Sequence, residues 1–285
     1  MRLVARVRFG CETARARAVG VNGLRLHFLE WGTPGRPALC FLHGGAAHAH
    51  WFDLVAPAFA DRFHVVSLDQ RGHGESQWAE PAAYATQDFV ADLIGVMDSL
   101  GWERTTVVGH SMGGHNAMAF AAWHPERVSR LVIVDSRPAI PPERLEGMHA
   151  RGRRGPRLHP DPDSAVRAFR LLPRETAAAP ELLAHLARAG FVERGGGWVY
   201  RFDPASNGSR SPVDAWPLLP RIAAPTLIVR GEWSPVLPRD MAERLRAAIA
   251  QARLVEIPEA YHHLVLDRPA VFVRELEAFL GSQPS

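Results

Sequence analysis

Short runs of apolar residues alternate along the chain with segments in which apolar residues recur at helical spacing. Most of the runs are continuous, which is typical of strands buried on both faces of a parallel sheet. The segments between them predict amphipathic helices that cover those faces. The predicted strands are 25–31, 38–42, 63–68, 104–108, 128–134, 225–230 and 253–257, and the predicted helices are 86–100, 114–124, 239–250 and 269–280. The pattern predicts a protein of the α/β class.

Residues 137–216 interrupt this alternation. They contain several prolines, the basic run Arg151-Gly152-Arg153-Arg154 and short helical patches over 165–172 and 180–189. We therefore expect an insertion with its own helices that contributes no strand to the sheet. The chain then divides into a first core part (1–136), a helical cap (137–216) and a second core part (217–285).

The positive charge of the chain is unevenly distributed. All 33 basic residues are arginine, which indicates codon bias more than selection for a polyanion, so we expect no nucleic-acid partner. The predicted cap holds 13 arginines and 9 acidic residues, whereas the rest of the chain holds 20 and 21. The cap arginines either bind a substrate carboxylate or form a solvated face, and the sequence leaves both readings open.

The cysteines and the N-terminal segment bear on the compartment. Cys40 falls in an apolar predicted strand and Cys11 in a polar stretch, so we expect no disulfide framework and a reduced, cytoplasmic protein. No apolar run approaches the ~20 residues that a membrane span needs. Residues 1–19 carry five arginines and one acid but lack the apolar core of a signal peptide, so an extension or an upstream start codon is expected. A monomer and a homodimer remain equally open.

The sequence Gly109-His110-Ser111-Met112-Gly113 carries the strongest chemical signal. It joins a predicted strand to a predicted helix, which is the context that a nucleophile elbow requires. The serine of such an elbow sits on a strained turn, and small residues on either side let strand and helix pass closely. Ser111 is therefore the candidate nucleophile.

Four motifs together resemble the α/β-hydrolase fold family, over about residues 20–136 and 217–281. They are His43-Gly44-Gly45, the segment from Asp69-x-Arg71-Gly72 to Ser76, the elbow, and the segment from Tyr261-His262-His263 to Pro269. The resemblance implies a mostly parallel central sheet flanked by helices, with the insertion in the family's cap position after the sixth core strand. It also implies a serine hydrolase that needs no cofactor.

The resemblance assigns roles to several residues. His262 corresponds to the catalytic base, with the neighbouring His263 as a wall of the site. The backbone N–H groups of Gly45 and Met112 correspond to the oxyanion hole. Further candidate pocket residues are His43, Gly44, His110, Trp198 and Trp216. The two tryptophans fit a small core of the cap equally well.

The acid of the triad departs from the family's commonest pattern. That pattern places Asp soon after the strand at 225–230, but the chain has Ser234 there, in Gly231-Glu232-Trp233-Ser234. The family's second solution is an acid at the end of the preceding strand, which here is Asp135. We expect Asp135 to be the acid, with Glu232 as the alternative.

The predicted activity is hydrolysis of a small-molecule carboxylic ester through an acyl-enzyme. The same residues suit a carbon–carbon bond hydrolase of ring-cleavage products, a lactonase or a thioesterase, and the fold also supports lyases and ligand receptors. In this family, epoxide hydrolases and haloalkane dehalogenases use an Asp nucleophile, so Ser111 argues against both. The histidines at 43, 48, 50, 262 and 263 complete no recognised zinc spacing, and no metal site is expected.

Overall fold

The computed structural model describes residues 13–281 and contains one eight-stranded sheet in the order β1-β2-β4-β3-β5-β6-β9-β10. Strands β4, β3, β5, β6, β9 and β10 are parallel, while the hairpin β1–β2 joins antiparallel to β4. Every strand expected from the sequence is present. The strands are β1 Arg15–Val21, β2 Leu24–Gly32, β3 Ala38–Leu42, β4 His64–Leu68, β5 Thr105–His110, β6 Val128–Val134, β9 Thr226–Gly231 and β10 Ala252–Ile257.

Two hydrophobic cores lie on the two faces of this sheet. Successive strand residues alternate between them, so Leu131 and Ile133 of β6 enter one core while Val132 and Val134 enter the other. This explains why the strands read as continuous apolar runs. The first core is covered by α1 (Thr86–Ser99), α2 (Met112–Trp123) and α7 (Arg239–Ala248), and the second by α8 (Leu264–Asp267) and α9 (Pro269–Gly281).

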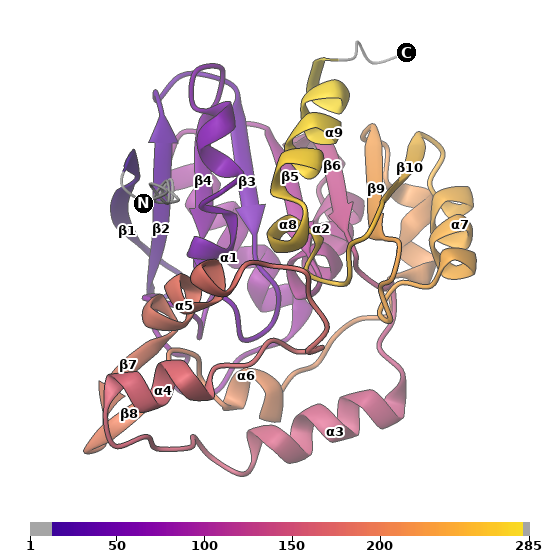
Figure 1. Ribbon diagram of the computed structural model, residues 1–285. Coiled ribbons are helices and arrows are strands. Elements are labelled where there is room, and N and C mark those ends of the chain that lie inside the picture. Colours follow the sequence, from indigo (N-terminus) through magenta and orange to yellow (C-terminus); the bar gives the residue numbers. More distant parts are fainter. Residues whose placement is uncertain (1–12, 282–285) are drawn as a thin grey trace, which may run out of the picture.

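The insertion between β6 and β9 lies at the carboxyl ends of the parallel strands (Figure 1). It contains α3 (Pro142–Gly152), α4 (Pro162–Ala168), α5 (Pro180–Ala189) and α6 (Ala205–Gly208). As expected, it adds no strand to the main sheet, but it is not purely helical. Strands β7 (Phe191–Arg194) and β8 (Gly197–Tyr200) form a separate antiparallel hairpin.

The hairpin forms for a reason that lies in its local sequence, although the sequence pattern predicts only helices here. Gly195 and Gly196 both adopt positive φ, +62° and +80°, as the tightest two-residue hairpin turns require. The flanking residues are aromatic and β-branched, which favours strands over helix. The predicted helical patch at 165–172 is likewise shorter than expected, because Phe169 takes extended backbone (ψ 134°) and ends α4.

The loop from Asp69 to Ser76 ties the segments beside the site together. The Asp69 carboxylate accepts hydrogen bonds from the N–H groups of Ala49 and Glu75, at 2.6 and 3.0 Å, and pairs with His27 at 2.7 Å. The Arg71 guanidinium forms a bidentate pair with Asp92 of α1, at 2.6 and 2.7 Å. The loop is thus a structural clamp beside the insertion, to which it is hydrogen-bonded through Gly72 and Gly74.

Other expectations concern the chain as a whole. Residues 1–12, including Cys11, lie outside the described residues. Cys40 is buried in β3, and burial raises its thiol pKa to about 12, so it is chemically inert. Among residues 13–281, no helix has the length and apolar character to cross a membrane.

Replacing Arg71 by alanine tests the clamp. The variant leaves the Asp92 carboxylate, 2% exposed, without its cation, so the free energy of unfolding should fall by about 3–5 kcal/mol. Arg246→Ala is the matched control, because Arg246 and Glu243 pair at 3.0 Å with half-exposed side chains, and its loss should cost less than about 1 kcal/mol. Urea unfolding followed by circular dichroism measures both. Equal, small losses would show that the Arg71 pair is not a structural clamp.

Candidate active site

Ser111 lies at the sharp turn between β5 and α2. Its backbone adopts φ +52° and ψ −113°, a strained conformation for a residue with a side chain. A Cβ at position 109 would lie 2.4 Å from the carbonyl oxygen of Gly113, and one at position 113 would lie 2.3 Å from that of Leu42. Only glycine fits at either position, so the elbow depends on both glycines.

The elbow is fastened to the end of β6. The Ser111 N–H donates to the carbonyl oxygen of Val134 at 3.0 Å, and the Ser136 hydroxyl donates to the carbonyl oxygen of Ser111 at 2.6 Å. These bonds hold the strained turn in place and leave the Ser111 side chain at the wall of a cavity.

Asp135 directly follows β6 and is fully buried. Its Oδ2 accepts from His262 Nδ1 at 2.6 Å and from the Ser234 hydroxyl at 2.5 Å, and its Oδ1 accepts from the Gly231 N–H at 3.2 Å. Each of these three groups donates, so both carboxyl oxygens act as acceptors. Because this carboxylate can only accept, His262 carries its proton on Nδ1, which leaves Nε2 as the proton acceptor.

Glu232 and Ser234 take different places in the turn after β9. Glu232 is exposed, and its Oε2 accepts from the N–H of Glu259 at 2.8 Å. Ser234 stands where the commonest pattern has the acid, and its side chain still points toward the histidine loop, where it donates to Asp135. The geometry therefore pairs His262 with Asp135 and leaves Glu232 outside.

The three neighbouring histidines face different ways. His110 Nε2 donates to the carbonyl oxygen of His262 at 3.0 Å, and His263 Nε2 donates to that of Pro173 in the insertion at 3.0 Å. Burial lowers the pKa of His263 to about 3 and holds that of His110 well below its ordinary value. Both are therefore neutral and position the loop, and only His262 points toward the acid.

The loop after β3 is locked against the elbow. The carbonyl oxygen of His43 accepts from the Gly113 N–H at 3.1 Å, and the His43 ring bridges the carbonyl oxygen of Gly44 (2.7 Å) and the N–H of Gln70 (3.1 Å). Burial lowers the pKa of His43 to about 4, so it is neutral. A Cβ at position 44 would lie 3.2 Å from Ser111 Cβ, which places this loop directly beside the serine.

Gly45 and Met112 face each other across the elbow. A Cβ added at position 45 would meet nothing closer than the Met112 sulfur at 4.0 Å, so this side of Gly45 is open. Met112 is the first residue of α2, and the N–H of a first helical residue has no carbonyl partner within its helix. Both residues line the same cavity as Ser111.

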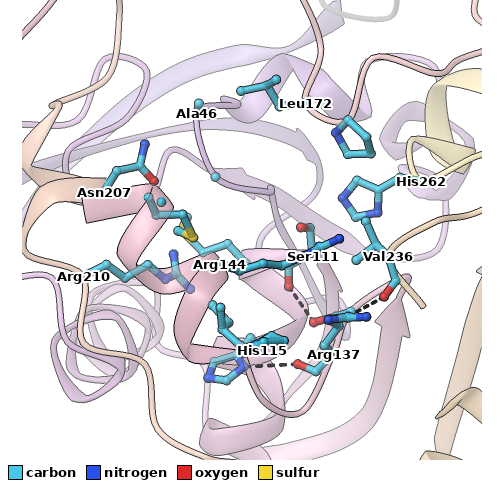
Figure 2. A pocket seen from close by; sticks show the side chains of 18 of the residues that line it. Ala46, Ser111, His115, Arg137, Arg144, Leu172, Asn207, Arg210, Val236 and His262 are labelled. Carbon is cyan, nitrogen blue, oxygen red and sulfur yellow. Dashed lines mark hydrogen bonds between the residues drawn. The ribbon is translucent and has the colours of Figure 1, made fainter. Parts of the chain in front are cut away.

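That cavity has a volume of about 670 Å³ and lies between the elbow and the insertion (Figure 2). Ser111 and His262 line it from the core, and α3 contributes much of its outer wall. Its charged lining residues are Arg137, Arg144, Arg151, Arg210, Glu143 and Glu175. A cavity of this size suits a small organic molecule.

A second cavity, of about 280 Å³, adjoins the first and shares Gly45, Ala46, Arg151, Leu172 and Asn207 with it. Its other lining residues include the aromatic side chains of Trp51, Phe169, Tyr200, Phe202 and His263. They also include three exposed arginines, Arg157, Arg170 and Arg174.

The structure places the two predicted pocket tryptophans elsewhere. Trp198 lies in β8 and packs against the second core, to which residues of the insertion contribute. Trp216 is the first residue of the 3₁₀ helix Trp216–Arg221, and the Arg244 guanidinium lies over its ring at 4.8 Å. Neither is among the residues that line the two cavities, and His43, Gly44 and His110 lie behind the wall. The aromatic lining from the predicted run comes instead from Tyr200 and Phe202.

Two groups of described residues bring enough nitrogen and carboxylate atoms together for a metal ion. One is His110, His262 and His263, and the other is His50, Asp53 and His185. In the first group His110 and His263 each direct a ring nitrogen to a backbone carbonyl and His262 directs one to Asp135. In the second, both histidines bind the Asp53 carboxylate, at 2.9 and 2.7 Å. Each of these histidines thus makes at least one hydrogen bond, while His110 Nδ1 and His263 Nδ1 are buried without a partner among the described residues.

Comparison with known proteins gives a consistent fold but several activities. The chain is 28% identical over 272 residues to 2-(acetamidomethylene)succinate hydrolase of Mesorhizobium japonicum, which covers 94% of this chain and 95% of that protein. A solved structure of E-2-(acetamidomethylene)succinate hydrolase matches with a TM-score of 0.83 at 26% identity, over 94% of this chain and all of the other. An esterase of Mycobacterium tuberculosis is 28% identical over 95% of this chain and 90% of its own length.

A third relative is the enol-lactonase from Burkholderia xenovorans. Its structure has a TM-score of 0.78 and 25% identity, over 93% of this chain and all of the other. These names share hydrolysis and differ in substrate. A family model described as alpha/beta hydrolase fold matches residues 37–269, so the chain belongs to the α/β-hydrolase fold family and is a hydrolase of that fold.

Proposed function

We propose that this protein is a serine hydrolase that cleaves carboxylic esters of small molecules through an acyl-enzyme. One observation carries the proposal: Ser111 on its strained elbow and His262, hydrogen-bonded to buried Asp135, line the same cavity. The names of two relatives, an esterase and an enol-lactonase, support ester chemistry, since a lactone is a cyclic ester. The insertion serves as a cap that encloses the substrate.

The reaction follows from the proton positions. His262 Nε2 takes the proton of the Ser111 hydroxyl as its oxygen attacks the ester carbonyl. Asp135 holds the resulting imidazolium by charge and by the Nδ1 hydrogen bond. The N–H groups of Gly45 and Met112 bind the oxyanion of the tetrahedral intermediate. His262 then protonates the leaving alcohol and activates the water that releases the acid.

This chemistry uses only the residues of the chain, and the proposal includes no cofactor. The same groups act on a thioester or a lactone, so the scissile bond is chosen by what the cap admits. A lyase or a ligand receptor on this fold differs in a simple observable, since it releases no acid from an ester.

Turnover of p-nitrophenyl esters with acyl chains of two to sixteen carbons tests the proposal. The wild type should show a chain-length optimum, because a cavity of about 670 Å³ limits the acyl group. Ser111→Ala should lower kcat by at least about a thousandfold, since the attacking oxygen is gone. Circular dichroism checks that the variant is folded. Substantial turnover by folded Ser111→Ala would remove Ser111 as the nucleophile, and no turnover by the wild type would redirect the search to the lyase or receptor alternatives.

The choice of acid is tested by a matched pair of amides. Asp135→Asn should lower kcat about 10³- to 10⁴-fold, because an amide cannot hold the imidazolium and favours the wrong tautomer of His262. Glu232→Gln keeps an oxygen for the Glu259 N–H and should change kcat less than about threefold. Steady-state kinetics on the best ester compares them. The assignment is reversed if Glu232→Gln causes the larger loss.

A further inference from the structure

Arg210 is a buried cation whose guanidinium has no partner among residues 13–281. It follows α6, is 4% exposed, and lines the cavity that contains Ser111. Its Nε is buried and makes no hydrogen bond, and no ion pair or side-chain hydrogen bond involves its guanidinium within the described part of the chain. Only its backbone is engaged, where the carbonyl oxygen accepts from His149 Nε2 at 2.8 Å.

The guanidinium of Arg210 stays charged although it is buried. Burial lowers the pKa of Arg210 to about 10, so the guanidinium remains protonated at neutral pH. A buried charge is strongly unfavourable unless an opposite charge and hydrogen bonds satisfy it. Among residues 13–281, the other buried arginines are Arg71 and Arg230, and they meet this demand by pairing with Asp92 and Glu256. Arg210 has no such carboxylate among these residues, which indicates that its counter-ion is a molecule that enters the cavity.

The position of Arg210 suits recognition at a distance from the reacting bond. Figure 2 shows Arg210 with His115 and Asn207 on one side of the cavity and His262 on the other, with Ser111 between them. Burial, with the charge of Arg210 as a second cause, lowers the pKa of His115 to about 4, so this neighbour is neutral. The amide of Asn207 adds a hydrogen-bonding group beside the guanidinium.

The remaining charges of the cavity are less confined. Arg144 and Arg151 are exposed, and the exposed acids Glu143 and Glu175 line the same cavity. Arg137 is half-buried and its Nε donates to the carbonyl oxygen of Val236 at 2.5 Å. The rim therefore carries mixed charge, which attracts anions only weakly and is screened by salt. Among the described arginines that line this cavity, only Arg210 is buried, and it has no carboxylate partner within residues 13–281.

We propose that Arg210 binds a carboxylate of the substrate, so that the protein acts on esters whose acyl or alcohol part carries a carboxylate away from the scissile bond. The planar guanidinium matches a carboxylate through two parallel hydrogen bonds. The aromatic side chains of the second cavity are then available for an apolar part of the same molecule. This specificity rests on the proposed esterase function, but the binding of the carboxylate does not.

Two pairs of esters measure the contribution of Arg210 to turnover. Mono-p-nitrophenyl adipate is compared with p-nitrophenyl hexanoate for a carboxylate on the acyl side, and 4-acetoxybenzoate with phenyl acetate for one on the alcohol side. In at least one pair, the charged-to-neutral ratio of kcat/KM should fall about 10- to 100-fold in Arg210→Met, through loss of a charge-assisted bidentate pair. Turnover of the neutral esters should persist. An unchanged ratio in both pairs overturns the proposal.

Arg151→Met is the matched control, because it removes the same charge from the exposed rim of the same cavity. Its charged-to-neutral ratio should change less than about threefold at low salt. At roughly 0.3 M salt, where the Debye length is ~6 Å, the ratio should not change. If Arg151→Met lowers the ratio as much as Arg210→Met does, the effect is general attraction of anions and the Arg210 site is refuted.

Ligand binding separates this proposal from the esterase function. Adipate and benzoate are titrated into folded Ser111→Ala and into the double variant Ser111→Ala/Arg210→Met, with thermal shift and calorimetry as readouts. At least one of the two anions should raise the Tm of the first protein and not of the second. Without ligand, Arg210→Met should have an equal or higher Tm, because it relieves an unpaired buried charge. A lower Tm of the ligand-free variant together with unchanged anion binding would identify Arg210 as structural instead.

Discussion

The buried carboxylate of Asp135 is the interaction on which the arrangement of the site depends. It has no contact with solvent, and its donors come from the end of β9, the turn after β9 and the loop after β10. A charge in so dry a place is tolerated only when all of these segments are docked. The order β5-β6-β9-β10 within the sheet supplies this condition, because it brings the carboxyl ends of neighbouring parallel strands together. The order of the strands therefore also determines where His262 is held and which way its ring faces.

Backbone strain is concentrated at the same edge of the sheet. Ser111 and Asp135, the residues that follow β5 and β6, both have positive φ, +52° and +45°. Such conformations cost of order 1–3 kcal/mol each and persist only when the surroundings enforce them. The glycines at 109 and 113 and the hydrogen bonds to Val134 and Val229 provide that enforcement. The two side chains are thus held by the ends of rigid strands rather than by mobile loops.

The fold, and the residues that meet at the candidate site, could largely be predicted from local sequence. The reason differs from one feature to the next. The strands and the elbow could be predicted because each depends on a short contiguous pattern. Asp135 could be predicted because a residue that ends a strand beside β5 must lie at the carboxyl edge. The hairpin of β7 and β8 was missed although its Gly195-Gly196 turn was visible, because helical patches dominated the reading of 137–216. Trp216 does not line either cavity, and its ring contacts Arg244, so its role in a pocket stays a prediction.

The environment of Arg210 could not be predicted from the sequence. It is one of 13 arginines in 137–216, and nothing in its immediate neighbours distinguishes it from those that face solvent. What distinguishes it is burial without a counter-ion, a property of the packed structure. A buried cation that lines the same cavity as Ser111, and has no carboxylate partner among residues 13–281, also disfavours cationic ligands, because they would meet a like charge in a medium of low dielectric constant. The two adjoining cavities differ in how positive charge is presented. The first contains the buried guanidinium of Arg210, whereas the second combines aromatic side chains with exposed arginines, and Gly45 and Ala46 line both.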